Sequence, residues 1–295
     1  MTELTPLGAP DRLELGEGVR WADGRLVCVD ILTGRLLTPD GDDPNGDGAA
    51  PLRPLARLDV PLGAVAPVAG RPGTWIAAAG TGICLLTPGT APEWLADPEG
   101  DATRAMRMND GCADPHGRFW AGSMAYDGTP GAGSLYRTGP DGTVTRALDD
   151  ITVPNGPAFD GDGATMYLAD SARGLVRRYP VDPRDGGLGE GEEFARVTGG
   201  SPDGMTVDRE GALWTAVWGA GEVRRYLPDG TLATVLRLPV AQPAGLCLGG
   251  DDGRTLYVTT ARVGLAAPGL LDGAVFRARV EVPGLPTAAY RPTVS

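Results

Sequence analysis

Six copies of one pattern run through the sequence, and this repeat constrains the fold more than any other feature. Each copy begins with a glycine and a short apolar run, reverses at a turn that often carries Asp and Gly, and continues into a second apolar run. Successive copies start 45, 48, 45, 48 and 41 residues apart. A period of this length is typical of one four-stranded blade of a β-propeller. The starting glycines are Gly18, Gly63, Gly111, Gly156, Gly204 and Gly245.

A pair of residues, bulky in most copies, follows each turn. A propeller blade packs between two others, so large side chains at one repeated position suit its two apolar faces. PDG turns within residues 134–148 and 222–236 are typical of outer hairpins. We therefore predict one all-β domain over residues 1–295, a single six-bladed β-propeller with four-stranded antiparallel blades and no helical domain. The paired residues are Leu26-Val27, Thr74-Trp75, Phe119-Trp120, Met166-Tyr167, Leu213-Trp214 and Leu256-Tyr257.

Two polar, Gly-rich stretches interrupt the repeat, residues 39–51 and residues 182–193. We expect both to form exposed loops. An acidic metal-binding loop is the alternative for the first stretch, although it lacks the ligand spacing and the closing Glu of an EF-hand.

Composition excludes several classes of function. The net charge of −12 disfavours nucleic acid and anionic membranes as partners, and no apolar run is long enough to span a membrane. The N-terminal stretch lacks the basic and apolar regions of a signal peptide, and the four cysteines form no CxxC pair. We therefore expect a cytoplasmic protein with free thiols and no obligatory protein partner. The chain has no Lys, which excludes Schiff-base chemistry through that residue.

The residue before each repeat glycine carries the functional signal. In a propeller, these positions near the start of the innermost strands approach one another at the central axis, and four of the six residues bear side-chain oxygens. Like carboxylates packed this closely are unfavourable without a cation or a shared proton. Turn capping is the alternative role, but it does not explain four polar residues at one repeat position, so we predict a metal site in the central channel. The six residues are Glu17, Leu62, Asp110, Asn155, Asp203 and Ala244.

Oxygen ligands define the metals that such a site would take. They suit Ca²⁺, Mg²⁺ and Mn²⁺, with Zn²⁺ and Fe²⁺ as alternatives. Of only three Asn in the chain, Asn109 and Asn155 fall at or beside the repeat position, which indicates a need for a neutral amide oxygen. We expect the single histidine, His116, to face solvent and Cys112 to pack rather than react.

Familiar catalytic patterns are missing from the sequence. The chain has one His, no HExxH, no GxSxG and no GxxxxGK[ST], which argues against zincin, serine-hydrolase and P-loop chemistry. Any chemistry therefore falls to a metal and the carboxylates.

Four motifs resemble those of the senescence-marker-protein/regucalcin/gluconolactonase family, which includes luciferin-regenerating-enzyme-like proteins. They are RxNDGxxDPxGRFWxGxM at residues 107–124, PNGPAF at 154–159, SPDGMTVDxEGxLWxAxW at 201–218 and LYVTTAR at 256–262. The resemblance extends from about Gly16 to Arg262, and GEGVRW near the N-terminus is similar to the family's GExPxW but lacks its Pro.

The resemblance implies roles for individual residues. Three positions match the family's ligands for one divalent metal ion, namely Glu17, Asn155 and Asp203. Arg107 and Asn109 match its substrate-contacting pair.

We expect roles in the site for two further acidic residues. Asp127 falls where many family members have a substrate-contacting acid, often the longer Glu. Asp110 is the remaining polar axial residue, and we expect it to support and orient the site.

The family implies metal-dependent hydrolysis of sugar lactones such as glucono-1,5-lactone, with Ca²⁺ as the first expectation for the metal. In that reaction we assign Asp203 as general base or proton shuttle, while Arg107 and Asn109 hold sugar hydroxyls. One alternative is a related propeller esterase that acts on other lactones or phosphotriesters. The other is a non-catalytic propeller that binds calcium or a protein partner.

Overall fold

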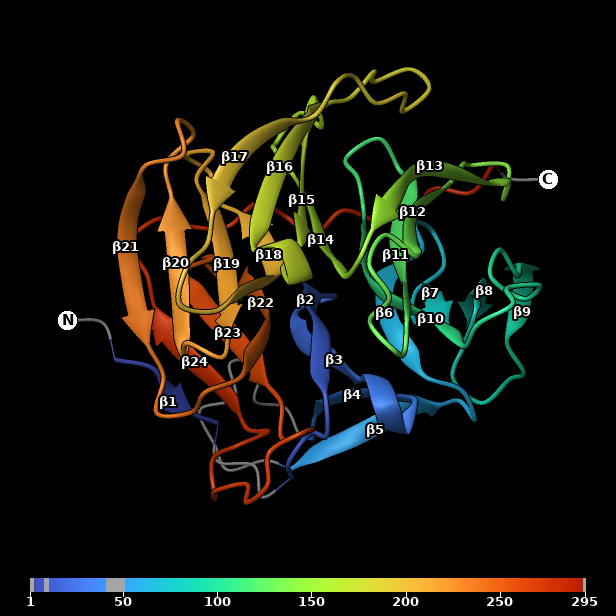
Figure 1. Ribbon diagram of the computed structural model, residues 1–295. Helices are drawn as coiled ribbons and strands as arrows, with labels where there is room; N and C mark the ends of the chain where they lie inside the picture. The colour runs from blue at the N-terminus through green and yellow to red at the C-terminus, as the bar shows by residue number, and fades with distance from the viewer. Residues whose placement is uncertain (1–2, 8–10, 41–50, 294–295) are drawn as a thin grey trace.

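Six sheets of four strands each make up the part of the chain that the computed structural model describes, residues 3–7, 11–40 and 51–293. The sheets follow one another around a central axis (Figure 1). The innermost strands contact one another in sequence order, and the ring closes because the first, β2 (Gly16–Ala22), contacts the last, β22 (Pro243–Gly249). The six-bladed propeller predicted from the repeat is confirmed.

The first three blades each use four consecutive strands, which follow one another from the axis outward. Blade 1 comprises β2, β3 (Arg25–Asp30), β4 (Arg35–Pro39) and β5 (Leu52–Arg57). Blade 2 comprises β6 (Leu62–Pro67), β7 (Trp75–Ala79), β8 (Gly82–Leu86) and β9 (Glu93–Ala96). Blade 3 comprises β10 (Met106–Ala113), β11 (Phe119–Ala125), β12 (Gly133–Thr138) and β13 (Val144–Ile151).

Blades 4 and 5 follow the same scheme, whereas blade 6 takes its outermost strand from the N-terminal part of the chain. Blade 4 comprises β14 (Pro154–Phe159), β15 (Thr165–Asp170), β16 (Leu175–Pro180) and β17 (Glu192–Arg196). Blade 5 comprises β18 (Ser201–Val207), β19 (Leu213–Trp218), β20 (Glu222–Tyr226) and β21 (Leu232–Arg237). Blade 6 comprises β22, β23 (Thr255–Thr260), β24 (Val275–Arg279) and β1 (Thr5–Pro6).

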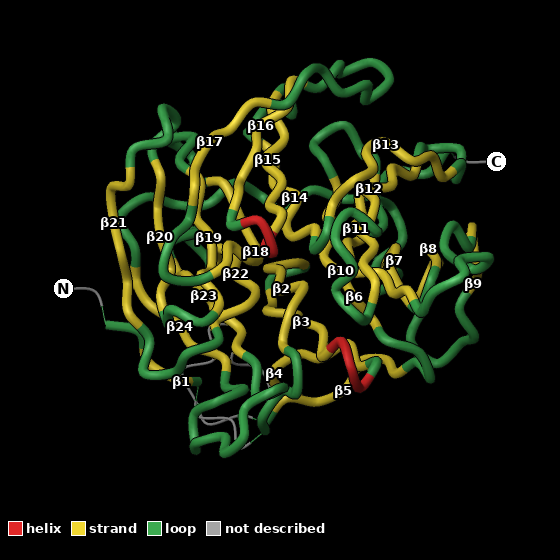
Figure 2. The backbone as a smooth tube through the Cα atoms, viewed as in Figure 1, coloured by secondary structure: helices red, strands yellow, loops and turns green. Residues whose placement is uncertain are grey.

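Two short 3-10 helices are the only helices within the described residues, and Figure 2 shows them in red. η1 (Ile31–Thr33) follows β3 and η2 (Ser171–Arg173) follows β15. Each ends at a glycine with left-handed φ, 64° at Gly34 and 63° at Gly174, a conformation that glycine adopts at low cost. No described helix is long and apolar enough to cross a membrane.

A β-bulge interrupts the pairing between the first two strands of every blade at or beside the repeat glycine. A bulge inserts an extra residue into one strand and changes the direction of its side chains. At Gly18 and Gly156 the bulge requires φ of 53° and 78°, and at Gly63 a Cβ atom would lie 2.3 Å from the Asn109 carbonyl oxygen. The repeat glycines therefore allow neighbouring blades to approach closely at the axis.

Apolar side chains fill the space between neighbouring blades, as the sequence predicts. Between blades 5 and 6, for example, one buried cluster includes Trp214, Leu246, Val258 and Phe276. Residues 182–191 form a largely exposed turn between β16 and β17, which confirms most of one predicted loop, while residues 192–193 already belong to β17. The other, 39–51, lies mainly outside the described residues.

His116 faces solvent only in part, whereas we expected it to be exposed. Its ring is half-buried, and its Nε2 atom is enclosed without a hydrogen-bond partner. The turn of blade 4 covers it, since a Cβ atom on Gly163 would lie 2.9 Å from His116 Cδ2. Position within a turn predicts exposure only when no neighbouring blade overhangs it.

A buried aspartate fastens the turn that follows the innermost strand in blades 3 and 5. In blade 5, Asp208 Oδ1 accepts hydrogen bonds from the Glu210 and Ala212 backbone N–H groups at 2.9 and 3.1 Å. Its Oδ2 accepts from Trp214 Nε1 and Arg225 Nε, both at 2.8 Å. Asp114 makes the equivalent contacts to Trp120 and Arg118 in blade 3.

We expect Asp208→Ala to lower the free energy of unfolding by about 3–5 kcal/mol, because the buried Trp214 indole N–H, two turn N–H groups and Arg225 Nε all lose their acceptor. Denaturant unfolding followed by tryptophan fluorescence measures this loss. Asp229→Ala is the matched control, since it removes an exposed turn carboxylate that accepts only from Thr231. Equal losses in the two variants would contradict the expectation.

Candidate functional site in the central channel

A cavity of about 490 Å³ lies at the end of the channel where the innermost strands begin. Five of the seven predicted site residues line it, so the structure brings together side chains that are far apart in the sequence. They come from blades 1, 3, 4 and 5. The lining residues are Leu15, Glu17, Leu32, Arg107, Asn109, Met124, Tyr126, Val153, Asn155, Ser171, Ala172, Ser201, Asp203, Trp218 and Val263.

Hydrogen bonds link the predicted substrate pair to the predicted amide ligand. Arg107 Nη1 donates to Asn109 Oδ1 at 2.6 Å. Asn109 Nδ2 donates to Asn155 Oδ1 at 2.9 Å and to the Pro154 carbonyl oxygen at 2.8 Å. Asn155 Nδ2 in turn donates to Ser171 Oγ at 2.8 Å. The amide oxygen of Asn155 thus accepts one hydrogen bond and retains a second lone pair.

Glu17 and Asp203 place two buried carboxylates in the lining of the same cavity as this amide. Glu17 Oε2 and Asp203 Oδ1 are both enclosed and have no hydrogen-bond partner. Burial is the largest cause and the negative charge of Asp110 the second largest of a rise in the pKa of Asp203 to about 8. The pKa of Glu17 also lies well above its ordinary value, mainly because of burial and next because of the negative charge of Asp203. Without a cation, the two groups therefore hold on to protons at pH values where exposed carboxylates have lost them.

These oxygens fit a hard divalent cation. Two carboxylate oxygens lack partners, and the residue with the neutral amide, Asn155, lines the same cavity. Oxygen donors of these kinds are the ones that such cations prefer. Within the described residues, no group of three or more His, Cys, Asp or Glu side chains could hold a metal ion. The set formed by Glu17, Asp203 and Asn155 differs because its third member is an amide.

Arg107 is the one cation among the described residues that line the cavity. Burial lowers the pKa of its guanidinium. The charges of the nearby Tyr126, Glu17 and Asp203 act in the opposite direction and partly offset this decrease. Its Cζ atom lies 6.0 Å from the centre of the Tyr126 ring. Arg107 is therefore placed between the acidic floor of the cavity and an aromatic side chain that is half exposed at its mouth.

Asp110 lies outside the cavity lining and connects blades 3 and 4. Its Oδ1 accepts from the Gly111 backbone N–H at 2.8 Å and its Oδ2 from that of Gly156 at 3.1 Å. Arg20 Nη2 lies 3.8 Å from the same carboxylate. Burial raises the pKa of Asp110, while Arg20 and the two N–H groups oppose that rise. These contacts suit the supporting role expected from the sequence.

The structure does not bring Asp127 to the other predicted residues. It lies in the loop after β11, and 65% of its side chain is exposed. Its Oδ1 accepts from the backbone N–H and hydroxyl of Thr129 at 3.0 and 2.7 Å. The residue before it, Tyr126, lines the cavity instead.

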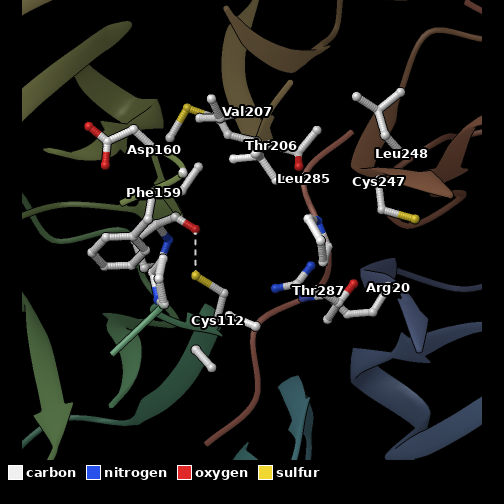
Figure 3. Close-up of a pocket in the computed structure, with 18 of the residues that line it drawn as sticks. Arg20, Cys112, Phe159, Asp160, Thr206, Val207, Cys247, Leu248, Leu285 and Thr287 are labelled. Atoms are coloured by element: carbon white, nitrogen blue, oxygen red, sulfur yellow. Dashed lines mark hydrogen bonds between the residues drawn. The ribbon is translucent and has the colours of Figure 1, made fainter. Parts of the chain in front are cut away.

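A second, smaller cavity of about 110 Å³ lies where the innermost strands end (Figure 3). Its walls are mainly apolar side chains, with Arg20 and Cys112 among the exceptions, and the segment 285–288 passes along it. Cys112 Sγ donates to the Pro157 carbonyl oxygen at 3.0 Å, and burial raises the pKa of this thiol to about 12. Cys112 therefore packs, as expected, and all four cysteines are free. The polar groups suited to chemistry belong to the larger cavity.

Sequence reasoning missed several residues of the larger cavity. Tyr126, Met124 and Trp218 form part of its wall, although they lie at the ends of second strands rather than at the repeat position. Ser171 was missed because it opens a 3-10 helix. The one available signal was a serine directly after the strand sequence TMYLAD.

Comparison with known proteins agrees with the motifs. Residues 15–262 match the family model described as the SMP-30/Gluconolactonase/LRE-like region. The chain is 36% identical over 282 residues to a 6-deoxy-6-sulfogluconolactonase of Pseudomonas putida, covering 92% of each chain. It is 32% identical over 288 residues to a pentonolactonase of Haloferax volcanii, covering 92% of this chain and 93% of the relative.

A solved structure extends the likeness to three dimensions. Regucalcin from Agrobacterium tumefaciens, described as a calcium-binding protein, superimposes with a TM-score of 0.86 at 30% identity, over 97% of both chains. The resemblance inferred from the four motifs is therefore confirmed. Sequence and structure together show that this protein belongs to the SMP-30/gluconolactonase/LRE-like family.

Proposed function

We propose that this protein is a divalent-metal-dependent hydrolase that opens sugar lactones to aldonic acids. The observation that carries the proposal is the pair of enclosed, unpartnered carboxylate oxygens on Glu17 and Asp203 at the floor of an accessible cavity. The relatives support the same reaction, since two of them are a sulfogluconolactonase and a pentonolactonase. The free thiols agree with a cytoplasmic location, which we also propose.

Glu17, Asn155 and Asp203 would hold the metal ion. A bound divalent cation would polarise the ester carbonyl and lower the pKa of a water molecule beside it. Oxygen donors favour Ca²⁺, and a relative with 30% identity is described as calcium-binding. Zn²⁺, Mn²⁺, Mg²⁺ and Fe²⁺ also accept such ligands and are the alternatives.

Proton transfer in the reaction falls to Asp203. Water adds to the lactone carbonyl carbon and the ring C–O bond then breaks, so a proton must pass from the water to the departing alkoxide. Asp203 accepts that proton at its carboxylate and delivers it to the ring oxygen.

Arg107 and Asn109 position the substrate. The Arg107 guanidinium has five N–H donors, and its Nη1 atom donates to Asn109 Oδ1 and to the Met108 carbonyl oxygen. The remaining donors can bind sugar hydroxyls and stabilise the oxyanion that develops on the carbonyl oxygen. We also propose that Asp127 contacts the end of the substrate that lies farthest from the metal. For this contact, the exposed loop that carries Asp127 would have to approach the substrate.

A calcium-binding protein without catalytic activity is the second candidate, because one solved relative is described only in those terms. Assays on a panel of neutral aldono-lactones, other lactones and phosphotriesters separate the candidates. Turnover of none of these esters by metal-loaded protein would favour the binding protein. Turnover of phosphotriesters alone would favour a different esterase.

Removing divalent metal is expected to abolish lactonase activity. Chelator-treated protein, dialysed and shown to be metal-free, should regain activity when one divalent ion is restored, because Glu17 and Asp203 need a compensating charge. A pH-stat assay on gluconolactone, xylonolactone and galactonolactone measures the recovery. Full activity in demonstrably metal-free protein would falsify the proposal.

Asp203→Asn should lower kcat by about 10²-fold or more even at saturating metal, because it removes the proton acceptor. Glu17→Gln removes a charge from the same site but leaves proton transfer intact, so excess metal should restore much of its kcat. The comparison requires metal titrations of both variants. Recovery of Asp203→Asn to wild-type kcat would make Asp203 a ligand only.

Arg107→Ala is expected to raise KM by about tenfold or more, because hydrogen bonds from a buried cation to substrate are lost. Arg237→Ala is the matched control, since its side chain is 81% exposed on β21 and its loss should leave KM unchanged. Steady-state kinetics on the preferred lactone give both values. An unchanged KM for Arg107→Ala would place substrate binding elsewhere.

A further inference from the structure

Ser171 connects two blades within the cavity wall. It is the first residue of η2, directly after β15, and it is buried. Its Oγ accepts a hydrogen bond from Asn155 Nδ2 at 2.8 Å. The same hydroxyl donates to the Pro202 carbonyl oxygen at 2.5 Å, in the residue before Asp203. One side chain thus contacts the amide of blade 4 and the strand of blade 5 that carries a predicted ligand.

Hydrogen bonds run in series from Arg107 through Asn109, Asn155 and Ser171 to the Pro202 carbonyl oxygen. The groups at the two ends of this series fix the direction of every bond in it. At one end, Arg107 can only donate, so the atom of Asn109 that faces it must be the oxygen. At the other end, the Pro202 carbonyl can only accept, so the single hydroxyl proton of Ser171 must point there. Ser171 Oγ is then left as an acceptor for Asn155.

Asn155 is consequently held in one of its two amide orientations. Its NH₂ group must face Ser171 and its oxygen must face Asn109, in a side chain that lines the cavity. Rotation of the amide by 180° would present NH₂ to the Asn109 NH₂ group and a carbonyl oxygen to an oxygen lone pair on Ser171. Both contacts would be repulsive.

Blade 1 provides an internal comparison. Its 3-10 helix η1 has the same length as η2, also follows an aspartate and also ends at a left-handed glycine. The residue in the place of Ser171 is Ile31, which is fully buried in an apolar cluster. The local fold therefore does not require a hydroxyl at this position, and the serine in blade 4 serves the contacts that it makes there.

We propose that Ser171 is a positioning residue that orients the Asn155 amide so that its oxygen, and not its nitrogen, faces the metal site. The inference rests on the proposed function, because it concerns the ligand set of that metal. Ser171 acts through Asn155, as second-layer hydrogen bonds orient metal ligands in other proteins.

The first test measures metal affinity rather than activity. Isothermal titration calorimetry with CaCl₂, MnCl₂ and ZnCl₂ is performed on metal-free wild type and on Ser171→Ala. We expect the Kd of the variant to rise by about 10–100-fold, the usual effect of removing such a partner. Thr38→Val is the matched control, because the buried Thr38 hydroxyl also donates to a backbone carbonyl oxygen, that of Leu26 at 2.7 Å, but lies outside the cavity lining. Its Kd should change by less than about threefold.

A double-mutant cycle then distinguishes orientation from a general structural effect. Asn155→Asp replaces the amide by a carboxylate, which presents an oxygen to the site in either orientation. Ser171→Ala should therefore weaken binding by less than about threefold when combined with Asn155→Asp, against about tenfold or more when Asn155 is intact. Thermal unfolding of each metal-free variant confirms that the proteins compared are folded.

Three results would overturn the inference. Wild-type affinity in Ser171→Ala would mean that the hydroxyl does not orient the ligand. Equal losses with and without the Asn155→Asp substitution would mean that Ser171 supports the structure without selecting an orientation. Absence of cation binding by the wild type would remove the proposed metal site, and with it this inference, which distinguishes that failure from the other two.

Discussion

Closing six innermost strands into a ring forces the residues at one repeat position toward a common axis, and three of those residues are carboxylic acids. Burial raises the pKa of Glu17, Asp110 and Asp203 alike, so each would be costly to ionise alone. The surroundings treat them differently. Asp110 receives two backbone N–H groups and lies near Arg20, whereas Glu17 and Asp203 each keep an oxygen without a partner. The protein thus supplies hydrogen-bond donors and a nearby cation to Asp110, and it leaves Glu17 and Asp203 available to a ligand.

The repeat made most of the fold predictable because each blade must bury two faces, and that requirement appears as glycines and bulky pairs at a fixed spacing. The outermost strand of blade 6 was not predictable in this way. β1 contains two residues, Thr5 and Pro6, which are too few to show a pattern. It pairs with β24 only because the closed ring brings the two segments together. The partial burial of His116 was missed for a similar reason, since the covering turn at Gly163 belongs to another blade.

The candidate site was predictable where it coincides with the repeat position and unpredictable elsewhere. Glu17, Asn155 and Asp203 stand directly before repeat glycines, and Asn109 lies one residue further back. Their convergence follows from propeller geometry alone. Ser171 and Tyr126 belong to segments after second strands, whose course depends on the particular loop. The direction of the Asn155 amide also depends on partners from three blades, which no single stretch of sequence reveals.

The pairing of β1 with β24 also has a consequence for the order in which this protein can assemble. Thr5 lies opposite Arg277, so the last sheet joins segments separated by nearly the whole chain. Such distant pairings are slow to form, because the entropy of a very long loop is lost before their contacts stabilise the product. During synthesis, residues 3–7 leave the ribosome before residues 275–279 and cannot pair with them until these have followed. Until the two segments meet, β24 is an unpaired sheet edge, and an edge of that kind can pair with another chain.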